Sequence, residues 1–311
     1  MNIPKRHHYL PQFYLKNFTD DNGLLWVFDR EKNEYRQQLP KDTAIKGYYY
    51  AFKGKDGRKH TEIENFFSVI EGKTKPILIK LDKKESINTE EKEILAIFIS
   101  FLKTRVPHFE KLINESFEKI IKQMNRLMFS SEERVAAMID RYEKETGKKI
   151  KIDHKELIDF IQGDRYDIKF PREHSIKSML LLGQELIRYF LQMDWFFLWA
   201  PKNSSFITSD NPFLLLPPSD YNPKSFYGVG ILTPGAKKII PLTSHTCLIM
   251  GDHGGRMIGR IADPKAIRAI NLYSAINSDR FLIARAKLLL ERIVQITKVN
   301  KLEKKERIKI S

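Results

Sequence analysis

The apolar residues change their spacing twice along the chain, and this change constrains the fold more than any other feature of the sequence. Before about residue 60, short apolar runs are separated by turn residues, as in strands. Between about 61 and 200 the spacing is helical, and after 200 the short runs return before a last helix. This order predicts an α+β fold with N-terminal short strands, a central helical core, C-terminal antiparallel strands and a terminal helix.

These parts are expected to form a single α+β domain that spans residues 1–311. We place the N-terminal β part at about 1–60, the helical part at about 61–200, the β/α part at about 201–300 and a charged tail at 301–311. A chain of this length can bury one large core. The sequence contains no repeat and no low-complexity linker that would mark a boundary.

Local signals predict where the first elements begin and end. Turn residues centred on Glu31–Asn33 predict a hairpin, and Asp56-Gly57 predicts a further turn. Helical spacing begins at Ile63, and we expect that helix to end at about Gly72.

Two later helices carry capping signals. Asn88 followed by Glu91 fits a capping box at the start of a long helix, and Ser130 with Glu133 fits a second cap. Pro107 is expected to kink or break the helix that Asn88 begins.

The most apolar stretch, residues 178–200, is interpreted as a core helix at the apolar centre of the fold. It contains Glu185, Arg188 and Asp194, which a membrane-spanning helix would bury at a cost of several kcal/mol. The first residues lack the apolar segment of a signal peptide, so we expect a cytoplasmic protein. Cys247 is the one cysteine and lies in an apolar run, where we expect it to pack in the core.

Basic residues outnumber acidic residues by 54 to 39, which gives a net charge of +15. Such an excess favours a polyanionic partner, and nucleic acid is a commoner partner of this kind than an anionic membrane surface. A Lys-rich genome would produce the same excess without any such partner. The charge therefore favours nucleic-acid binding without identifying it.

Two adjacent histidines, His7 and His8, are the first candidate site residues. A neutral imidazole can accept a proton near pH 7 or bind a metal. In an extended segment neighbouring side chains point to opposite faces, so the two rings are not expected to act on one ligand. Packing of either ring as an aromatic residue is the alternative.

The segment 206–212, "FITSDNP", is the second candidate. Ser209, Asp210 and Asn211 bring a hydroxyl, a carboxylate and an amide together between two apolar runs. The same residues suit a purely structural turn, because Asx side chains bond nearby backbone N–H groups.

Charged residues of the predicted helices form the third candidate. Arg105 precedes the helix break, where its guanidinium can reach a phosphate or pair with a buried carboxylate. Glu64 and Glu71 are seven residues apart and share a helix face. Together with Asp210 they could hold a divalent cation such as Mg²⁺, although solvated acidic residues on an amphipathic helix are the simpler interpretation.

The motifs "HHYLPQFYLKNF" and "FITSDNP" resemble a bacterial family known as domain of unknown function 4238. The resemblance covers most of the chain and includes the elements His8 to Gln12, Glu64 with Glu71, Arg105-Val106-Pro107, Thr208 to Pro212, and Pro241-Leu242-Thr243. Leu10 and Thr243 depart from the commoner Val and Ser. The resemblance implies that the polar members of these motifs belong to one set, and it suggests a setting such as phage defence or a toxin module.

A shared set of His, Glu, Arg, Asp and Asn suits a site better than a core, because each unpaired buried polar group costs roughly 1–3 kcal/mol. We therefore expect a nuclease or related phosphodiester hydrolase. The expected catalytic residues are His8, Arg105, Asp210 and Asn211, the substrate-binding residues are His7, Gln12 and Ser209, and the metal ligands are Glu64, Glu71 and Asp210.

Two other functions remain open at this point. In the first, the chain is a non-enzymatic module that binds nucleic acid or a protein partner, and the polar set is a structural network. In the second, it is an enzyme that acts on a nucleotide or another phosphorylated metabolite.

Overall fold

We describe the protein from a computed structural model. It describes residues 6–47, 49–50, 62–222 and 228–302. The predicted turn at Asp56-Gly57 and most of the predicted charged tail lie outside these residues. Within them, the fold is α+β as expected.

Contacts along the chain form two compact units. Unit 1 comprises residues 1–108 and 179–311, and unit 2 comprises residues 109–178. Each unit is described by itself below. The expectation of one domain stays a prediction.

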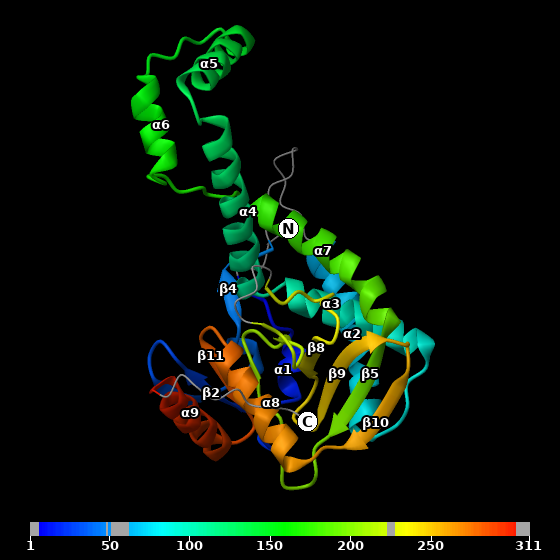
Figure 1. Cartoon of the computed structure of the whole chain (residues 1–311). Helices are drawn as coiled ribbons and strands as arrows, with labels where there is room; N and C mark the ends of the chain where they lie inside the picture. Colours follow the sequence, from blue (N-terminus) through cyan, green and yellow to red (C-terminus); the bar gives the residue numbers. More distant parts are fainter. Residues whose placement is uncertain (1–5, 48, 51–61, 223–227, 303–311) are drawn as a thin grey trace. The chain divides into compact units, whose positions relative to one another are not determined.

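The described residues of unit 1 form three sheets (Figure 1). The first pairs β1 (Arg6–His8) with β4 (Ile45–Gly47). The second has the order β10-β5-β9-β8-β7, formed by Met257–Ile261, Met193–Trp199, Thr246–His253, Lys237–Pro241 and Leu214–Leu216. The third has the order β3-β2-β11-β6, formed by Glu34–Gln38, Leu25–Asp29, Phe281–Ala284 and Thr208–Ser209. All neighbours are antiparallel except β10 and β5, which are parallel.

Helices of unit 1 flank these sheets. They are α1 (Gln12–Lys16), α2 (Glu62–Asp82), α3 (Thr89–Thr104), α8 (Pro264–Asn277) and α9 (Lys287–Leu302), with a short 3₁₀ helix at Pro40–Asp42. Two long helices, α4 (Pro107–Met128) and α7 (Arg172–Gln192), contain the points where the chain passes from one unit to the other.

Unit 2 is helical in its described secondary structure. Besides parts of α4 and α7, it contains α5 (Glu132–Thr146) and α6 (His154–Gln162). The ring of His174 stacks on Phe170 and meets Phe117 edge-on, which joins the start of α7 to α4 within the unit.

Several local signals are confirmed. Asn88 and Glu91 form a complete capping box, with Asn88 Oδ1 accepting from the Glu91 N–H at 2.8 Å and Glu91 Oε2 accepting from the Asn88 N–H at 2.8 Å. The helix ends at Thr104, and Pro107 begins the next one. The hairpin of β2 and β3 turns through Asn33, which has a φ of 52°.

Two expectations about helix limits are wrong. The cap of α5 is Ser131 rather than Ser130. Helix α2 continues past Gly72 and through Pro76 to Asp82, because Ile77, Leu78 and Leu81 are buried and hold the second half in place.

The expected core helix at 178–200 is the largest correction. Helix α7 ends at Gln192, and the aromatic run Met193–Trp199 is strand β5. This strand lies between β9 and β10 in the sheet, and aromatic residues pack well at such positions. Leu181 on α7 is 65% exposed, so α7 is not the apolar centre of the fold.

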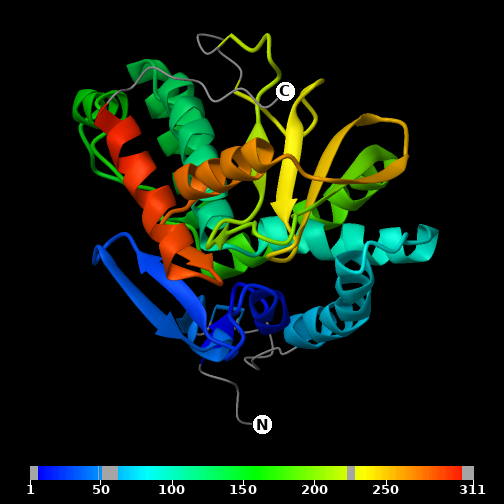
Figure 2. The ribbon, with the colours of Figure 1, turned by 90° about the horizontal axis from the view of Figure 1, so that it is seen from below.

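The apolar centre is built around α8 instead. Leu272 and Ala275 of α8 pack with Phe28, Leu282 and Leu290 from the four-stranded sheet and α9. Other α8 residues, Ile267 and Ile270, pack in a second cluster with members of the five-stranded sheet that include Leu198, Ile239 and Cys247. Cys247 is buried, as expected. Figure 2 shows α8 lying close to strands of both sheets.

Of the helices that the structure describes, none combines the length and the apolar character that crossing a bilayer requires.

Candidate functional site

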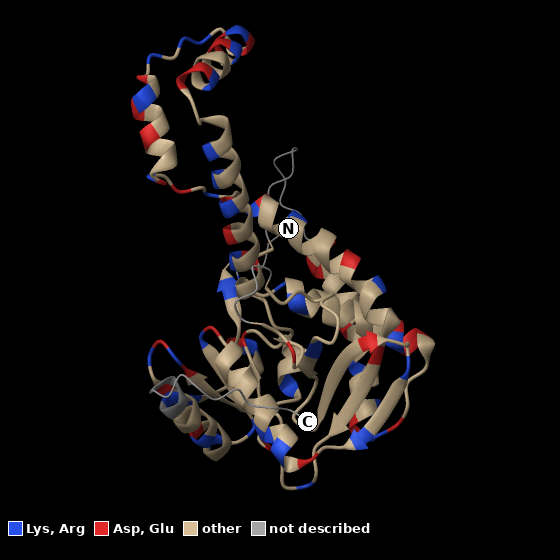
Figure 3. Cartoon of the chain, in the orientation of Figure 1, with Lys and Arg blue, Asp and Glu red and all other residues tan. Residues whose placement is uncertain are grey.

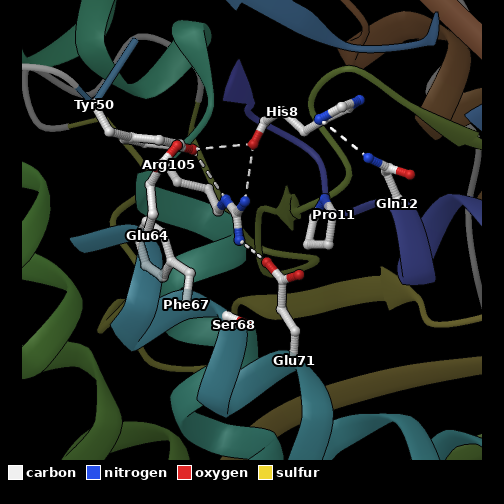
Figure 4. Close-up of a pocket in the computed structure, with 9 residues that line it drawn as sticks. All are labelled: His8, Pro11, Gln12, Tyr50, Glu64, Phe67, Ser68, Glu71 and Arg105. Atoms are coloured by element: carbon white, nitrogen blue, oxygen red, sulfur yellow. Dashed lines mark hydrogen bonds and ion pairs between the residues drawn. The ribbon is translucent and has the colours of Figure 1, made fainter. Parts of the chain in front are cut away.

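A pocket of about 180 Å³ lies in unit 1 where β1, α1, α2 and the end of α3 meet. Its lining, drawn in Figure 4, consists of His8, Pro11, Gln12, Tyr50, Glu64, Phe67, Ser68, Glu71 and Arg105. The buried members form its floor, whereas Gln12 and Ser68 are exposed and lie at its rim. The pocket thus brings together five of the residues expected from the sequence: His8, Gln12, Glu64, Glu71 and Arg105.

Helix α2 supplies one wall of the pocket through a single face. Glu64, Phe67, Ser68 and Glu71 follow one another at intervals of three, one and three residues, so they lie along one side of the helix. Figure 4 shows these four residues along the same ribbon. The shared face of Glu64 and Glu71 that the sequence predicts is therefore confirmed.

Arg105 holds the pocket together from the end of α3. Its Nη1 donates to Glu71 Oε1 at 2.8 Å, its Nη2 to the His8 carbonyl at 2.9 Å, and its Nε to the Tyr50 hydroxyl at 3.1 Å. The guanidinium also lies over the Phe67 ring, 4.4 Å from its centroid. One side chain thus links α3, α2, β1 and the segment at Tyr50.

The charge of Arg105 is kept despite its burial, at only 4% exposure. Burial disfavours the charged guanidinium, but Tyr50 and Glu71 outweigh that effect and raise the pKa of Arg105. The pocket floor therefore carries a permanent cation whose partner carboxylate is Glu71.

The two histidines of β1 face opposite sides, as strand alternation predicts. His7 is buried, its Nδ1 accepts from the Tyr50 N–H at 3.0 Å, and its ring stacks on Tyr50. The Glu64 carboxylate lies 3.4 Å from the same nitrogen. His7 does not line the pocket, so its expected role in substrate binding has no support from its position.

His8 is half-buried and both of its ring nitrogens have partners. Nε2 lies 3.0 Å from the Lys41 carbonyl, so we assign it the proton and the donor role. Nδ1 then accepts a weak hydrogen bond from the exposed Gln12 amide at 3.5 Å. Burial lowers the pKa of His8, and the bond to Lys41 offsets this only in part. His8 is therefore a neutral imidazole with a fixed tautomer at neutral pH.

Asp210 lies apart from this pocket. Its carboxylate accepts three hydrogen bonds from consecutive backbone N–H groups, those of Asp279 at 3.0 Å, Arg280 at 2.7 Å and Phe281 at 3.1 Å. Burial raises the pKa of Asp210 to about 6, although these N–H groups lower it. The expectation that Asp210 meets His8 in one pocket is wrong, because the carboxylate instead caps the segment that leads into β11.

The neighbours of Asp210, Ser209 and Asn211, also make hydrogen bonds within the protein. Asn211 Nδ2 donates to the Asn277 carbonyl at 3.1 Å, and the Ser209 hydroxyl donates to the Asn211 carbonyl at 2.9 Å. Both residues are almost fully buried. These contacts favour the alternative interpretation of the motif at 206–212, a structural turn.

The three carboxylates expected to hold Mg²⁺ are not gathered in one place. Glu64 and Glu71 line the pocket and Asp210 does not, and one oxygen of Glu71 accepts from Arg105. Within the described ranges, no group of three or more His, Cys, Asp or Glu residues could hold a metal ion. A divalent-cation requirement stays a prediction.

Four lining residues were not expected as site residues. Phe67 and Ser68 could have been found, because they lie on the helix face already defined by Glu64 and Glu71. Pro11 lies inside the motif His8 to Gln12, so it could have been found as well. Tyr50 had no such signal, since its place depends on how separate segments pack.

Comparison with known proteins identifies the family. A family model described as "protein of unknown function (DUF4238)" matches residues 6–288. Neither the curated proteins nor the solved structures contain a match to the chain.

Proposed function

The chain belongs to the DUF4238 family of proteins of unknown function, and we propose that it is a cytoplasmic nuclease whose active site is the pocket of His8 and Arg105. The proposed reaction is cleavage of a phosphodiester bond in nucleic acid. His8 acts as the general base, and Arg105 neutralises charge on the phosphate oxygens. A role as an anti-phage or toxin effector with a protein partner stays a prediction from the family resemblance.

The state of His8 is the observation that carries this proposal. A general base needs an unprotonated nitrogen at the working pH, and burial supplies it by lowering the pKa of His8. The Lys41 carbonyl holds the Nε2 proton, which leaves the Nδ1 lone pair directed toward the exposed Gln12 amide. Histidines that act as bases are oriented by this kind of hydrogen bond on the other ring nitrogen.

The hydrogen bonds of Arg105 support its proposed role, which is to neutralise charge on the phosphate oxygens. Nε, Nη1 and Nη2 each donate once to an acceptor that the structure describes. A guanidinium has five N–H groups, so one N–H on each terminal nitrogen has no acceptor among the described residues. Such a pair of donors suits the oxygens of a phosphate.

The distribution of charge between the units also favours a nucleic-acid substrate. Residues 109–178 contain fifteen Lys and Arg and fourteen Asp and Glu. Figure 3 shows both signs interspersed along the helices of this unit. The remaining +14 of the +15 belongs to the part of the chain that contains the pocket, where it would attract a polyanion.

One observation favours a non-enzymatic binding module instead. Arg105 bonds the His8 carbonyl and the Tyr50 hydroxyl, so it also stabilises the fold around the pocket. In that case the polar residues would position the N-terminal segment, and the chain would bind nucleic acid or a protein without changing it.

The test is incubation of the purified full chain with tRNA, total RNA and plasmid DNA, each with and without Mg²⁺. We expect cleavage by the wild type and at least 100-fold slower cleavage by His8→Ala, since a general base contributes roughly 10²–10⁴-fold. His253→Ala is the matched control, because His253 is exposed at the end of β9 and outside the pocket.

Binding without cleavage of any substrate would favour the module. Equal cleavage by the wild type and His8→Ala would remove His8 from the proposed mechanism. The melting temperature of each variant is measured alongside, so that loss of activity is separated from loss of fold.

A further inference from the structure

We propose that the pocket cleaves RNA rather than DNA, and that the nucleophile is the 2′-hydroxyl of the RNA itself. This inference rests on the proposed nuclease function and specifies its substrate. The inference depends on two observations: which polar groups of the pocket already make contacts within the protein, and which can still act on a substrate.

The three carboxylates expected as metal ligands are not arranged around one point. One oxygen of Glu71 accepts from Arg105 at 2.8 Å, and the Glu64 carboxylate lies 3.4 Å from the nitrogen of His7 that accepts the Tyr50 N–H. Asp210 accepts from three backbone N–H groups elsewhere. This residue set does not fit the paired-cation sites that activate water against phosphodiesters.

The pocket presents a different set of groups to a substrate. His8 offers a neutral imidazole, Arg105 offers the two N–H groups described above, and Gln12 and Ser68 offer polar side chains at the rim. These groups are suited to removing a proton from a hydroxyl that the substrate already holds beside its phosphorus. RNA carries such a hydroxyl and DNA does not.

The attack is intramolecular, so the substrate supplies the proximity of the nucleophile that a protein site would otherwise have to create. His8 Nδ1 takes the proton of the 2′-hydroxyl, and the 2′-oxygen forms a bond to phosphorus. The bond from phosphorus to the 5′-oxygen breaks, and that oxygen takes a proton from water. The hydroxide left behind takes the proton from His8. The products are a 2′,3′-cyclic phosphate and a free 5′-hydroxyl, and no oxidant or reductant is needed.

The size of the pocket limits how the RNA enters. A volume of about 180 Å³ is below the roughly 300–1,000 Å³ of pockets that enclose drug-sized ligands. We therefore expect it to receive only the ribose and phosphate at the cleaved bond, with the bases outside, as a single strand allows because its nucleotides can splay out and those of a duplex cannot.

The experiment uses two labelled single-stranded oligonucleotides of the same sequence and the wild-type full chain. One is DNA throughout, and the other is DNA with a single ribonucleotide at its centre. We expect cleavage of the second only, directly after the ribonucleotide, with a 2′,3′-cyclic phosphate identified by mass spectrometry. The cleavage rate is expected to fall at least 100-fold in His8→Ala and to be unchanged in His253→Ala.

An all-RNA strand of the same sequence separates the two ways in which the proposals can fail. Cleavage of the all-DNA strand, or RNA products that end in a 3′-hydroxyl, would overturn this inference and leave the nuclease proposal standing. If no strand is cleaved, the nuclease proposal fails and the inference fails with it. Neither result depends on a variant folding, because both use the wild type.

Discussion

Replacing Asp210 tests whether this carboxylate supports the fold or takes part in the reaction. In Asp210→Ala, the N–H groups of Asp279, Arg280 and Phe281 lose their acceptor together. These bonds are only part-buried, so each is counted at the roughly 1 kcal/mol net of a typical hydrogen bond, which gives a loss of about 3 kcal/mol in the free energy of unfolding. At about 2–4 °C per kcal/mol for chains of a few hundred residues, the melting temperature should fall by roughly 6–12 °C.

The measurement is thermal unfolding followed by circular dichroism at pH 7.5, with two further variants. Asp210→Asn keeps one acceptor oxygen and should lie between the wild type and Asp210→Ala. Asp220→Ala is the matched control, because Asp220 is exposed and this variant should have the melting temperature of the wild type.

A melting temperature of Asp210→Ala within about 1 °C of the wild type, combined with loss of cleavage, would refute this reasoning. Asp210 would then act on the substrate, as the sequence motif suggested. A large fall in melting temperature with cleavage retained below the transition would support the assignment as a structural cap.

Three further predictions follow from the same geometry. Burial lowers the pKa of His8, so kcat/KM should rise with pH with a midpoint below about 6.5 and then stay level through pH 8. A midpoint above pH 7 would contradict this expectation. Arg105→Lys keeps the charge but loses the fork of donors, so we expect a lower melting temperature and slower cleavage, and an unchanged variant would show that the three hydrogen bonds contribute nothing. The pKa of Asp210, about 6 in the fold, is above the roughly 3.9 of the unfolded chain, so the folded state holds the proton more strongly and stability falls as pH rises between these values. The free energy of unfolding of the wild type, measured with urea, should therefore exceed that of Asp210→Asn by less at pH 6 than at pH 4. A difference that grows over this range would contradict the predicted direction.

Local interactions explain which parts of the fold could be predicted. The capping box of Asn88 and Glu91 and the turn at Asn33 each depend on residues within four positions, so the sequence contains the whole signal. Strand β5 could not be separated from the preceding helix in this way. Its conformation depends on pairing with β9 and β10, which are more than forty residues away along the chain.

In the candidate site too, the features that depend on local sequence could be predicted and those that depend on distant contacts could not. The shared face of Glu64 and Glu71 follows from helix periodicity and needs no tertiary information. That Arg105 would bond the carbonyl of His8, ninety-seven residues earlier, has no local signal. The same holds for Asp210, whose three donors lie about seventy residues later, so the sequence motif alone does not show which segment its carboxylate meets.

Helix α8 contributes residues to both apolar clusters, one against each large sheet of unit 1. If either the four-stranded or the five-stranded sheet separates from α8, apolar side chains of α8 become exposed to water and the packing of the other sheet on α8 is weakened. We therefore expect the two sheets to open as one cooperative unit in native-state hydrogen exchange. The slowest amides should lie in α8 and in two strands that share its apolar clusters, β9 and β11, rather than in the segments that form the pocket.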